Sequence, residues 1–393
     1  MSSCWANTVL YFLGLTLAIA EDNFYEGHSL EAPCLPGHPC TLAFISDNPV
    51  FLRCPYTHLR APVSWQYLDP KWANEQPITF LHSGSSSRPS LGHAKLMRFW
   101  FRSRLVAGNL YIPSPSVKDS GVYTCQVGDA TVAYYHVDFQ DAGHLHVSHA
   151  SLGETTLENV TVYLGNGTWA EMFTSWSPWQ ACDRCGRRGE RKRVGFCYAQ
   201  VTESDQEGED PLPCGIARRK YPTLPQRGPE LRIETCQVPC DVSQVLAPEK
   251  PSTVPLLVFT TLHPQPMAIA HLRCPSSSIY SPVYWQEGLT KLTHFELLQK
   301  NSSQSLDKAT GGGILHLTFQ NGTHSTFYWC YVNGRLVGKF LLTSPVAVAA
   351  PRELAHTYSF LETLVVGFSS FLVVMMFLSI VQSCRRKPGT SIV

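Results

Sequence analysis

The chain has 393 residues and an apolar content of 44%, which is enough for about two to three domains with hydrophobic cores of their own. Its 31 Lys and Arg residues nearly balance its 30 Asp and Glu residues, so the formal net charge is only +1. A chain without a strong positive field does not attract nucleic acid as a whole, and we expect no nucleic-acid partner.

Residues 1–20 have the features of a secretory signal peptide. An apolar run extends from Val9 to Ala20 and ends in Ala18-Ile19-Ala20, the small-x-small pattern that signal peptidase accepts. Cleavage after Ala20 would place the mature chain in an oxidising compartment. An uncleaved anchor is the alternative interpretation.

The cysteines predict a set of disulfides. All but Cys4 and Cys384 of the 14 cysteines lie between the signal peptide and the C-terminal end of the chain, and an even number in an oxidising compartment indicates disulfides. We expect Cys34 and Cys40 to bridge locally, although either could pair with another cysteine. The others sort by spacing into Cys54 with Cys125, Cys274 with Cys330, and a cluster formed by Cys182, Cys185, Cys197, Cys214, Cys236 and Cys240.

An internal repeat predicts two immunoglobulin-like sandwiches, a variable-type one over residues 21–150 and a second one over residues 244–350. Each copy has the motif Leu-Arg-Cys-Pro and, eleven residues after its Cys, a Trp. In a sandwich this spacing lets the indole pack against the disulfide that joins the two sheets. A Tyr lies two residues before the second Cys of each copy, at the position of a tyrosine corner. The expected core residues are Trp65, Tyr123, Trp285 and Tyr328.

Residues 170–243, which follow an expected linker at 151–169, hold the cluster of six cysteines. The stretch WSPWQACDRCG at 176–186 and the basic stretch GERKR at 189–193 resemble a thrombospondin type-1 repeat. That family stacks alternating Trp and Arg side chains in a three-stranded rod with almost no hydrophobic core. Cation–π contacts and disulfides stabilise the rod in place of such a core. The resemblance implies a ladder of Trp176, Trp179, Arg191 and Arg193, and the disulfides Cys182–Cys236, Cys185–Cys240 and Cys197–Cys214.

Two other interpretations of this module stay open. Cys-x-x-Cys at 182 and Cys-x-x-x-Cys at 236 resemble the ligand spacing of a zinc site, but the oxidising compartment and the number of cysteines favour disulfides, and we expect no metal or cofactor. Six cationic residues could bind a glycosaminoglycan, although a structural ladder with solvated neighbours explains them as well. They are Arg184, Arg187, Arg188, Arg191, Lys192 and Arg193.

Four Asn-x-Ser/Thr sequons predict N-glycosylation, at Asn159, Asn166, Asn301 and Asn321. They lie before the C-terminal apolar segment, on the side of the membrane that the targeting signals place outside the cytosol.

The C-terminal end predicts a membrane anchor. The charge-free run from Thr363 to Cys384 predicts a transmembrane helix over residues 362–384, after a stem at 351–361. Three basic residues begin the tail at 385–393 and predict that this tail is cytosolic. The expected protein is therefore a single-pass type I membrane protein. Lipidation of Cys384 and a PDZ-type C-terminal motif at 391–393 are further possibilities.

Nearly the whole chain resembles the family with sequence similarity 187. Besides the motifs above, the resemblance rests on FQD at 139–141, HLHV at 144–147 and Cys197-Tyr198. It implies a single-pass membrane glycoprotein with immunoglobulin-like domains and implies little about activity.

The fold class that we expect is mainly β, with two sandwiches flanking the thrombospondin-like module and one transmembrane helix. The chain contains no phosphate-cradling glycine motif, no His-Glu-x-x-His and no Gly-x-Ser-x-Gly, so we predict no enzyme. The main hypothesis is a plasma-membrane recognition or adhesion glycoprotein that binds an unknown protein ligand or a partner in the same membrane. The alternative is an accessory subunit that assists the folding or trafficking of another membrane protein.

Overall fold

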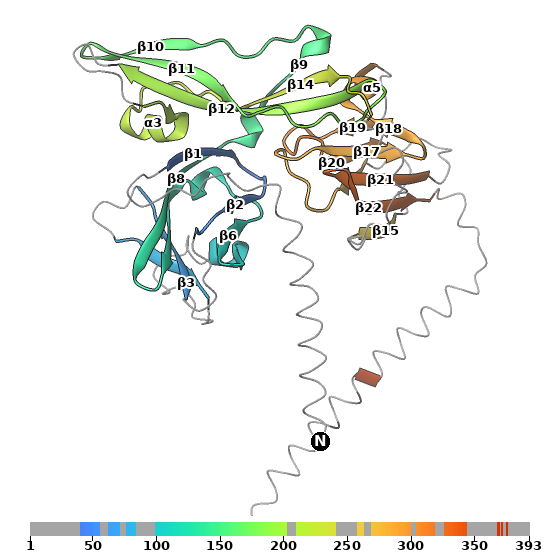
Figure 1. The fold of residues 1–393 in the computed structure, drawn as a ribbon, viewed down its shortest axis with the longest axis horizontal. Coiled ribbons are helices and arrows are strands. Elements are labelled where there is room, and N and C mark those ends of the chain that lie inside the picture. The colour runs from blue at the N-terminus through green and yellow to red at the C-terminus, as the bar shows by residue number, and fades with distance from the viewer. Residues whose placement is uncertain are drawn as a thin grey trace, which may run out of the picture. The chain divides into compact units, whose positions relative to one another are not determined.

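The computed structural model describes residues 40–55, 62–70, 76–83, 99–202, 210–240, 258–262, 269–299, 304–318 and 326–343, together with Phe368, Ser369, Phe371 and Met375. The chain divides into two compact units, Met1–Thr343 and Ser344–Val393. The described part of the first unit is mainly β, with short helices at connections (Figure 1).

Two sheets form the first sandwich. The larger one has the order β1-β8-β7-β3-β4, with β1 parallel to β8 and the other pairs antiparallel, and the smaller one has the order β2-β6-β5. The bounds are β1 (Cys40–Ile45), β2 (Val50–Leu52), β3 (Val63–Leu68), β4 (Ile78–His82), β5 (Arg104–Val106), β6 (Asn109–Ile112), the 3-10 helix η2 (Val117–Asp119), β7 (Gly121–Val127) and β8 (Ala130–Gln140).

The core of the first sandwich is built around the residues that the sequence motif singles out. The Cys54–Cys125 disulfide joins the sheets, and Trp65 is fully buried with its Nε1 donating to the carbonyl of Gly108 at 3.0 Å. The Tyr123 hydroxyl donates to the carbonyl of Asp119 at 2.5 Å, which is the predicted tyrosine corner. On the other side of this sheet, Gln66 of β3 and Gln126 of β7 are partly exposed, whereas Ser64 and Thr124 are buried.

The second sandwich has the sheet orders β15-β22-β21-β17-β18 and β16-β20-β19. Its disulfide is Cys274–Cys330, and Trp285 is fully buried. Tyr328 is buried as well, but its hydroxyl donates to Glu287 at 2.6 Å and forms no corner of the Tyr123 kind. The bounds are β15 (Val258–Leu262), β16 (Ile269–Arg273), β17 (Val283–Glu287), β18 (Thr290–Leu292), α5 (His294–Gln299), β19 (Gln304–Leu306), β20 (Ile314–Thr318), β21 (Thr326–Val332) and β22 (Arg335–Leu342).

The six-cysteine module contains a sheet of order β10-β11-β12-β14-β9, with β13 pairing β12 (Figure 1). Its long strand β12 pairs with β14 along residues 189–195 and with β11 along residues 195–202. The bounds are the 3-10 helix η3 (Ala142–His144), β9 (His146–His149), the 3-10 helix η4 (Ala150–Leu152), β10 (Val160–Gly165), β11 (Thr168–Trp176), β12 (Gly189–Thr202), β13 (Leu212–Pro213), α3 (Cys214–Lys220) and β14 (Glu230–Cys236).

This module differs from the expected thin rod in two respects. Strand β9 lies inside the predicted first domain and β10 inside the predicted linker, yet both pair into the module's sheet, where they cover strand edges that would otherwise be open. The half of β12 beyond the ladder also packs a small apolar core against α3. The core includes Met172, Ala199, Ala217 and Leu224.

The membrane anchor predicted at 362–384 lies almost entirely outside the described residues. The four described residues of the second unit are helical and fall within this segment. Across all residues that the structure describes, no helix has the length and hydropathy needed to cross a membrane. The predicted signal peptide and the cytosolic tail lie outside the described residues altogether.

Candidate functional site: the six-cysteine module and its junctions with the sandwiches

The module's six cysteines form the three disulfides that the thrombospondin resemblance implies. They are Cys182–Cys236, Cys185–Cys240 and Cys197–Cys214. Cys40 is also disulfide-bonded, while its expected partner Cys34 lies outside the described residues.

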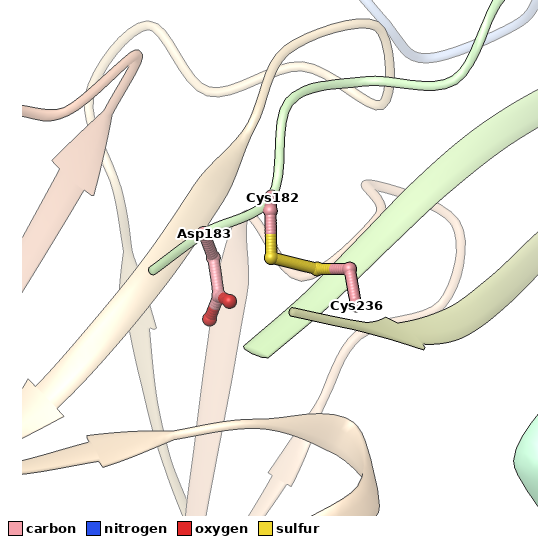
Figure 2. Close-up of side chains that lie close together, drawn as sticks. All are labelled: Cys182, Asp183 and Cys236. Atoms are coloured by element: carbon pink, nitrogen blue, oxygen red, sulfur yellow. A yellow bond between two sulfur atoms is a disulfide. The ribbon is translucent and has the colours of Figure 1, made fainter. Parts of the chain in front are cut away.

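The zinc hypothesis concerns the four cysteines of two motifs, Cys182, Cys185, Cys236 and Cys240, and the sulfurs of Cys182 and Cys236 lie beside the Asp183 carboxylate (Figure 2). Because all four sulfurs are in disulfides, none is available as the thiolate that zinc binds. Asp183 instead has a local structural role, since its Oδ1 accepts a hydrogen bond from the backbone nitrogen of Glu190 at 2.7 Å. Burial raises the pKa of Asp183, although this hydrogen bond acts in the opposite direction.

The predicted Trp–Arg ladder is present on the half of β12 that pairs with β14. The guanidinium of Arg193 lies 4.5 Å from the ring centroids of both Trp176 and Trp179, and that of Arg191 lies 4.9 Å from Trp179. Arg191 also forms an ion pair with Glu234 on β14, with an N–O distance of 2.5 Å. Planar guanidinium groups stack on indole faces, so these layers cover one face of this end of the sheet. Val194, Leu231 and Ile233 of the same strands belong to a hydrophobic cluster.

Most of the cations considered for a glycosaminoglycan site are engaged within the chain. Besides the two ladder arginines, Arg184 lies 3.5 Å from both Asp183 and Glu296, and the Arg188 guanidinium lies 5.1 Å from the Phe295 ring centroid. Lys192 is buried, whereas Arg187 is exposed. The geometry therefore favours the structural interpretation of this basic stretch over a free anion-binding patch.

Glu190 and Lys192, which have adjacent inward positions on β12, connect the module to the second sandwich. The Glu190 carboxylate accepts hydrogen bonds from the backbone nitrogens of His294, at 3.0 Å, and Phe295, at 2.7 Å, at the N-terminus of α5. Burial disfavours the charged form of Glu190 and raises its pKa. Hydrogen bonds from His149, His294 and the Phe295 backbone outweigh this effect and hold the pKa well below its usual range.

The ammonium of Lys192 donates a hydrogen bond to the carbonyl of Gly311 in the second sandwich. Desolvation by burial lowers the pKa of Lys192 to about 7, and the nearby Glu190 only partly offsets this effect. Lys192 is thus a structural cation at the module junction and is shielded from any solution ligand.

A second junction joins the module to the first sandwich. The side-chain amide of Gln140, at the end of β8, donates to the carbonyl of Cys197 at 2.8 Å and accepts from its backbone nitrogen at 2.9 Å. Asp138 accepts a hydrogen bond from the backbone nitrogen of Gly215 at 2.9 Å, at the start of α3. A Cβ at Gly215 would lie 2.0 Å from the Asp138 carboxylate, so only glycine fits this contact.

The two sandwiches also bind each other directly. The buried amide of Asn48 accepts from the backbone nitrogen of Ile279 at 2.9 Å and donates to the carbonyl of Ala309 at 3.0 Å. The backbone nitrogen of Ile45 donates to the Tyr280 hydroxyl at 2.6 Å. Sequence reasoning missed these junction residues, because single polar or aromatic side chains at loops give no periodic signal.

Of the predicted glycosylation sites, Asn159 and Asn166 fall on the β10–β11 hairpin, whereas Asn301 and Asn321 lie outside the described residues. Asn159 lies immediately before β10, and its Nδ2 donates to Glu171 at 3.0 Å. Asn166 lies in the turn and is exposed, with a positive φ of 51°. Both are therefore on the surface of the module.

The outer face of the first sandwich is another candidate site. Gln66 on β3 donates to Gln126 on β7 at 2.9 Å and accepts from the Thr124 hydroxyl at 3.3 Å. Tyr134 on β8 is the cross-strand neighbour of Thr124. Gln66, Gln126 and Tyr134 are partly exposed, and Thr124 is buried beneath them. All four side chains are uncharged, and the hydrogen bond between the two amides fixes their orientations.

Known proteins were compared with the chain in three ways. No family model matches it. Three curated relatives are Ig-like V-type domain-containing protein FAM187A of cattle (Bos taurus), 24% identical over 381 residues, of rat (Rattus norvegicus), 25% over 385, and of mouse (Mus musculus), 24% over 387. Each match covers 88% of this chain and 88% of the relative.

Two solved structures illustrate the structural comparison. The extracellular domain of the voltage-gated sodium channel beta4 subunit matches with a TM-score of 0.19 and 18% identity, over 29% of this chain and 98% of that one. The N-terminal eight immunoglobulin domains of Down syndrome cell adhesion molecule match with a TM-score of 0.20 and 12% identity, over 80% of this chain and 42% of that one. The full-length similarity to these curated relatives supports membership of the chain in the family with sequence similarity 187.

Proposed function

We propose that the chain is a cell-surface recognition or adhesion glycoprotein that binds another protein through the outer face of its first sandwich. The observation that carries this proposal is the uncharged face formed by the partly exposed Gln66, Gln126 and Tyr134, with Gln66 held from below by the buried Thr124. Centres of protein–protein interfaces are depleted in charged residues and enriched in tyrosine. Amides that already hold one another lose little conformational freedom when a partner docks.

The junctions support this proposal because they fix how the face is presented. The Asn48 amide ties the first sandwich to the second, and the Gln140 amide ties it to the module. A partner that binds this face therefore binds a first sandwich that is already joined to the module and to the second sandwich. The predicted signal peptide, sequons and membrane anchor add the expectation that this unit is displayed outside the cell.

Display is tested first, by surface biotinylation of cells that express the full chain. Recovery of the chain in the biotinylated fraction is expected. Retention of the chain inside the cell would contradict the cell-surface proposal and support the accessory-subunit alternative.

Binding is then tested with a set of purified extracellular proteins, by measuring how much of each protein binds to these cells. The variant Gln66→Arg/Gln126→Arg places two like charges in the centre of the face and is expected to lower binding of a bound protein by about tenfold or more. Arg335→Glu, at an exposed position of β22, is the matched control and should bind normally. Unchanged binding by the double variant would rule out this face as the docking site.

A further inference from the structure

Two large aromatic side chains face solvent on the β10–β11 hairpin. Tyr163 is 55% exposed and Trp169 is 51% exposed, and they are direct cross-strand partners. Their ring centroids are 4.8 Å apart, at an interplanar angle of 51°. The neighbouring residues of β11 alternate normally, with Ala170 and Met172 in the core, so the aromatic pair belongs to the outer face of the hairpin.

The turn between these aromatic residues is a sequon. Asn166 and Gly167 both have positive φ, 51° and 76°, which is typical of the two-residue type I′ turn that Asn-Gly favours. The hydroxyl of Tyr163 accepts a hydrogen bond from the backbone nitrogen of Gly167 at 3.2 Å. The Tyr163 ring therefore lies over the turn, beside the residue that follows Asn166, and Trp169 continues the same surface.

We propose that Asn166 carries an N-linked glycan whose first N-acetylglucosamine packs its apolar face on the rings of Tyr163 and Trp169. One face of this sugar presents C–H groups, which are attracted to the negative faces of aromatic rings. Asn166 lies midway between the two aromatic positions, three residues from each. The sugar would cover apolar surface that the protein leaves open and would hold the turn closed.

The modification is a group transfer from a lipid-linked sugar pyrophosphate. The amide Nδ2 of Asn166 forms a bond to the anomeric carbon of the sugar and loses one proton. The bond from that carbon to the pyrophosphate oxygen breaks, and the lipid pyrophosphate leaves with the electron pair. The inference rests on the proposed function, because the donor meets the chain only in the secretory pathway.

Asn159 provides the contrast within the same hairpin. Its side-chain nitrogen contacts the Glu171 carboxylate, which offers a sugar no aromatic face. A glycan on Asn159 should therefore leave the stability of the turn unchanged. If the sugar at Asn166 covers the aromatic pair, this face of the hairpin is also closed to protein partners, which leaves the first-sandwich face for recognition.

The test compares three samples of the full chain, made in a secretory host cell and purified in detergent. One sample is untreated, one is trimmed by an endoglycosidase that leaves a single N-acetylglucosamine, and one is the variant Thr168→Val, which removes the sequon hydroxyl but keeps the Asn166-Gly167 turn. Glycopeptide mass spectrometry establishes occupancy, and hydrogen exchange of the peptide that covers β10 and β11 reports opening of the hairpin. The first two samples should exchange alike, and the variant about three- to tenfold faster.

Two further variants separate sugar packing from other effects. In a Tyr163→Thr background, Thr168→Val should change hydrogen exchange much less, because one of the two rings that pack on the sugar is gone. Asn159→Gln should leave exchange of the hairpin unchanged. An untreated sample and a Thr168→Val variant that exchange at the same rate would overturn the inference, as would an unmodified Asn166 in a chain glycosylated at Asn159. A chain that carries no glycan and never reaches the surface would instead overturn the proposed function.

Discussion

At the scale of single residues, the junction between the module and the second sandwich contains a buried cation. Lys192 is 7% exposed and donates to a backbone carbonyl of the other domain, and desolvation lowers its pKa to about 7. A charge taken out of water is costly even when it is hydrogen-bonded. We therefore expect Lys192 to make the stability of the junction depend on pH.

The unfolded chain holds the Lys192 proton up to about pH 10, whereas the folded chain releases it near pH 7. Between these values the unfolded state binds more protons, so the free energy of unfolding should rise with pH, by about 1–3 kcal/mol. Below about pH 7 both states are protonated and this dependence ends. Denaturant titrations near pH 7 and near pH 9 measure the effect.

Lys192→Met removes the titrating group and should abolish this rise. Lys118→Met changes an exposed lysine and should retain the rise in full. A wild-type free energy of unfolding that is constant or falls over this pH range would show that Lys192 is not desolvated in solution.

At the scale of elements, β12 joins two kinds of stabilisation in one strand. Its first half supplies the arginines of the ladder, and its second half packs Cys197, Ala199 and Val201 into the core against α3. This arrangement explains why a module with six cysteines also has a hydrophobic core. The first half also contributes Val194, with Leu231 and Ile233 of β14, to a second hydrophobic cluster, and the stacked side chains stabilise its ladder face.

Trp179 is the central layer of the ladder, because the guanidinium groups of Arg191 and Arg193 both contact its ring. Trp179→Ala should lower the free energy of unfolding of the module by about 2–3 kcal/mol, and Trp176→Ala, which loses one cation contact, by about half as much. Arg193→Lys keeps the charge but removes the planar stacking group, so it should also destabilise the module. Thermal denaturation with the disulfides intact tests this order, and equal losses for both tryptophans would contradict it.

At the scale of the whole first unit, direct bonds between the sandwiches couple their unfolding. Asn48 is 1% exposed, and its amide satisfies one donor and one acceptor of the second sandwich. Asn48→Ala leaves those buried groups unpaired and should cost about 1–3 kcal/mol. Calorimetry should then resolve two unfolding transitions where the wild-type chain shows one.

Tyr280→Phe is the milder variant of the same junction, because it removes only the hydroxyl that accepts from the Ile45 backbone. It should broaden the transition less than Asn48→Ala does. A single transition at the wild-type temperature for both variants would mean that the sandwiches unfold independently of these contacts.

Local pattern alone predicted much of the fold. Short spacings in the sequence located the Cys54–Cys125 pair, the buried Trp65 and the hydroxyl of Tyr123 in its corner, and the structure contains each of them. Tyr328 occupies the matching position of the second copy, but its hydroxyl donates to Glu287 and forms no such corner. The ladder residues and their disulfides followed from the family resemblance rather than from spacing.

The sequence by itself determined the central core residues and the cysteine pair of each sandwich, because the disulfide between the sheets and the residues packed on it form a short, recurring motif. Only the tertiary structure showed that β9 and β10 extend the module's sheet, that Asn48 bonds to a nitrogen 231 residues away, and that Tyr163 and Trp169 flank a sequon turn on one face. Such contacts depend on strand register and on the packing of distant loops. A single polar side chain carries no periodic signal of a partner so far along the chain.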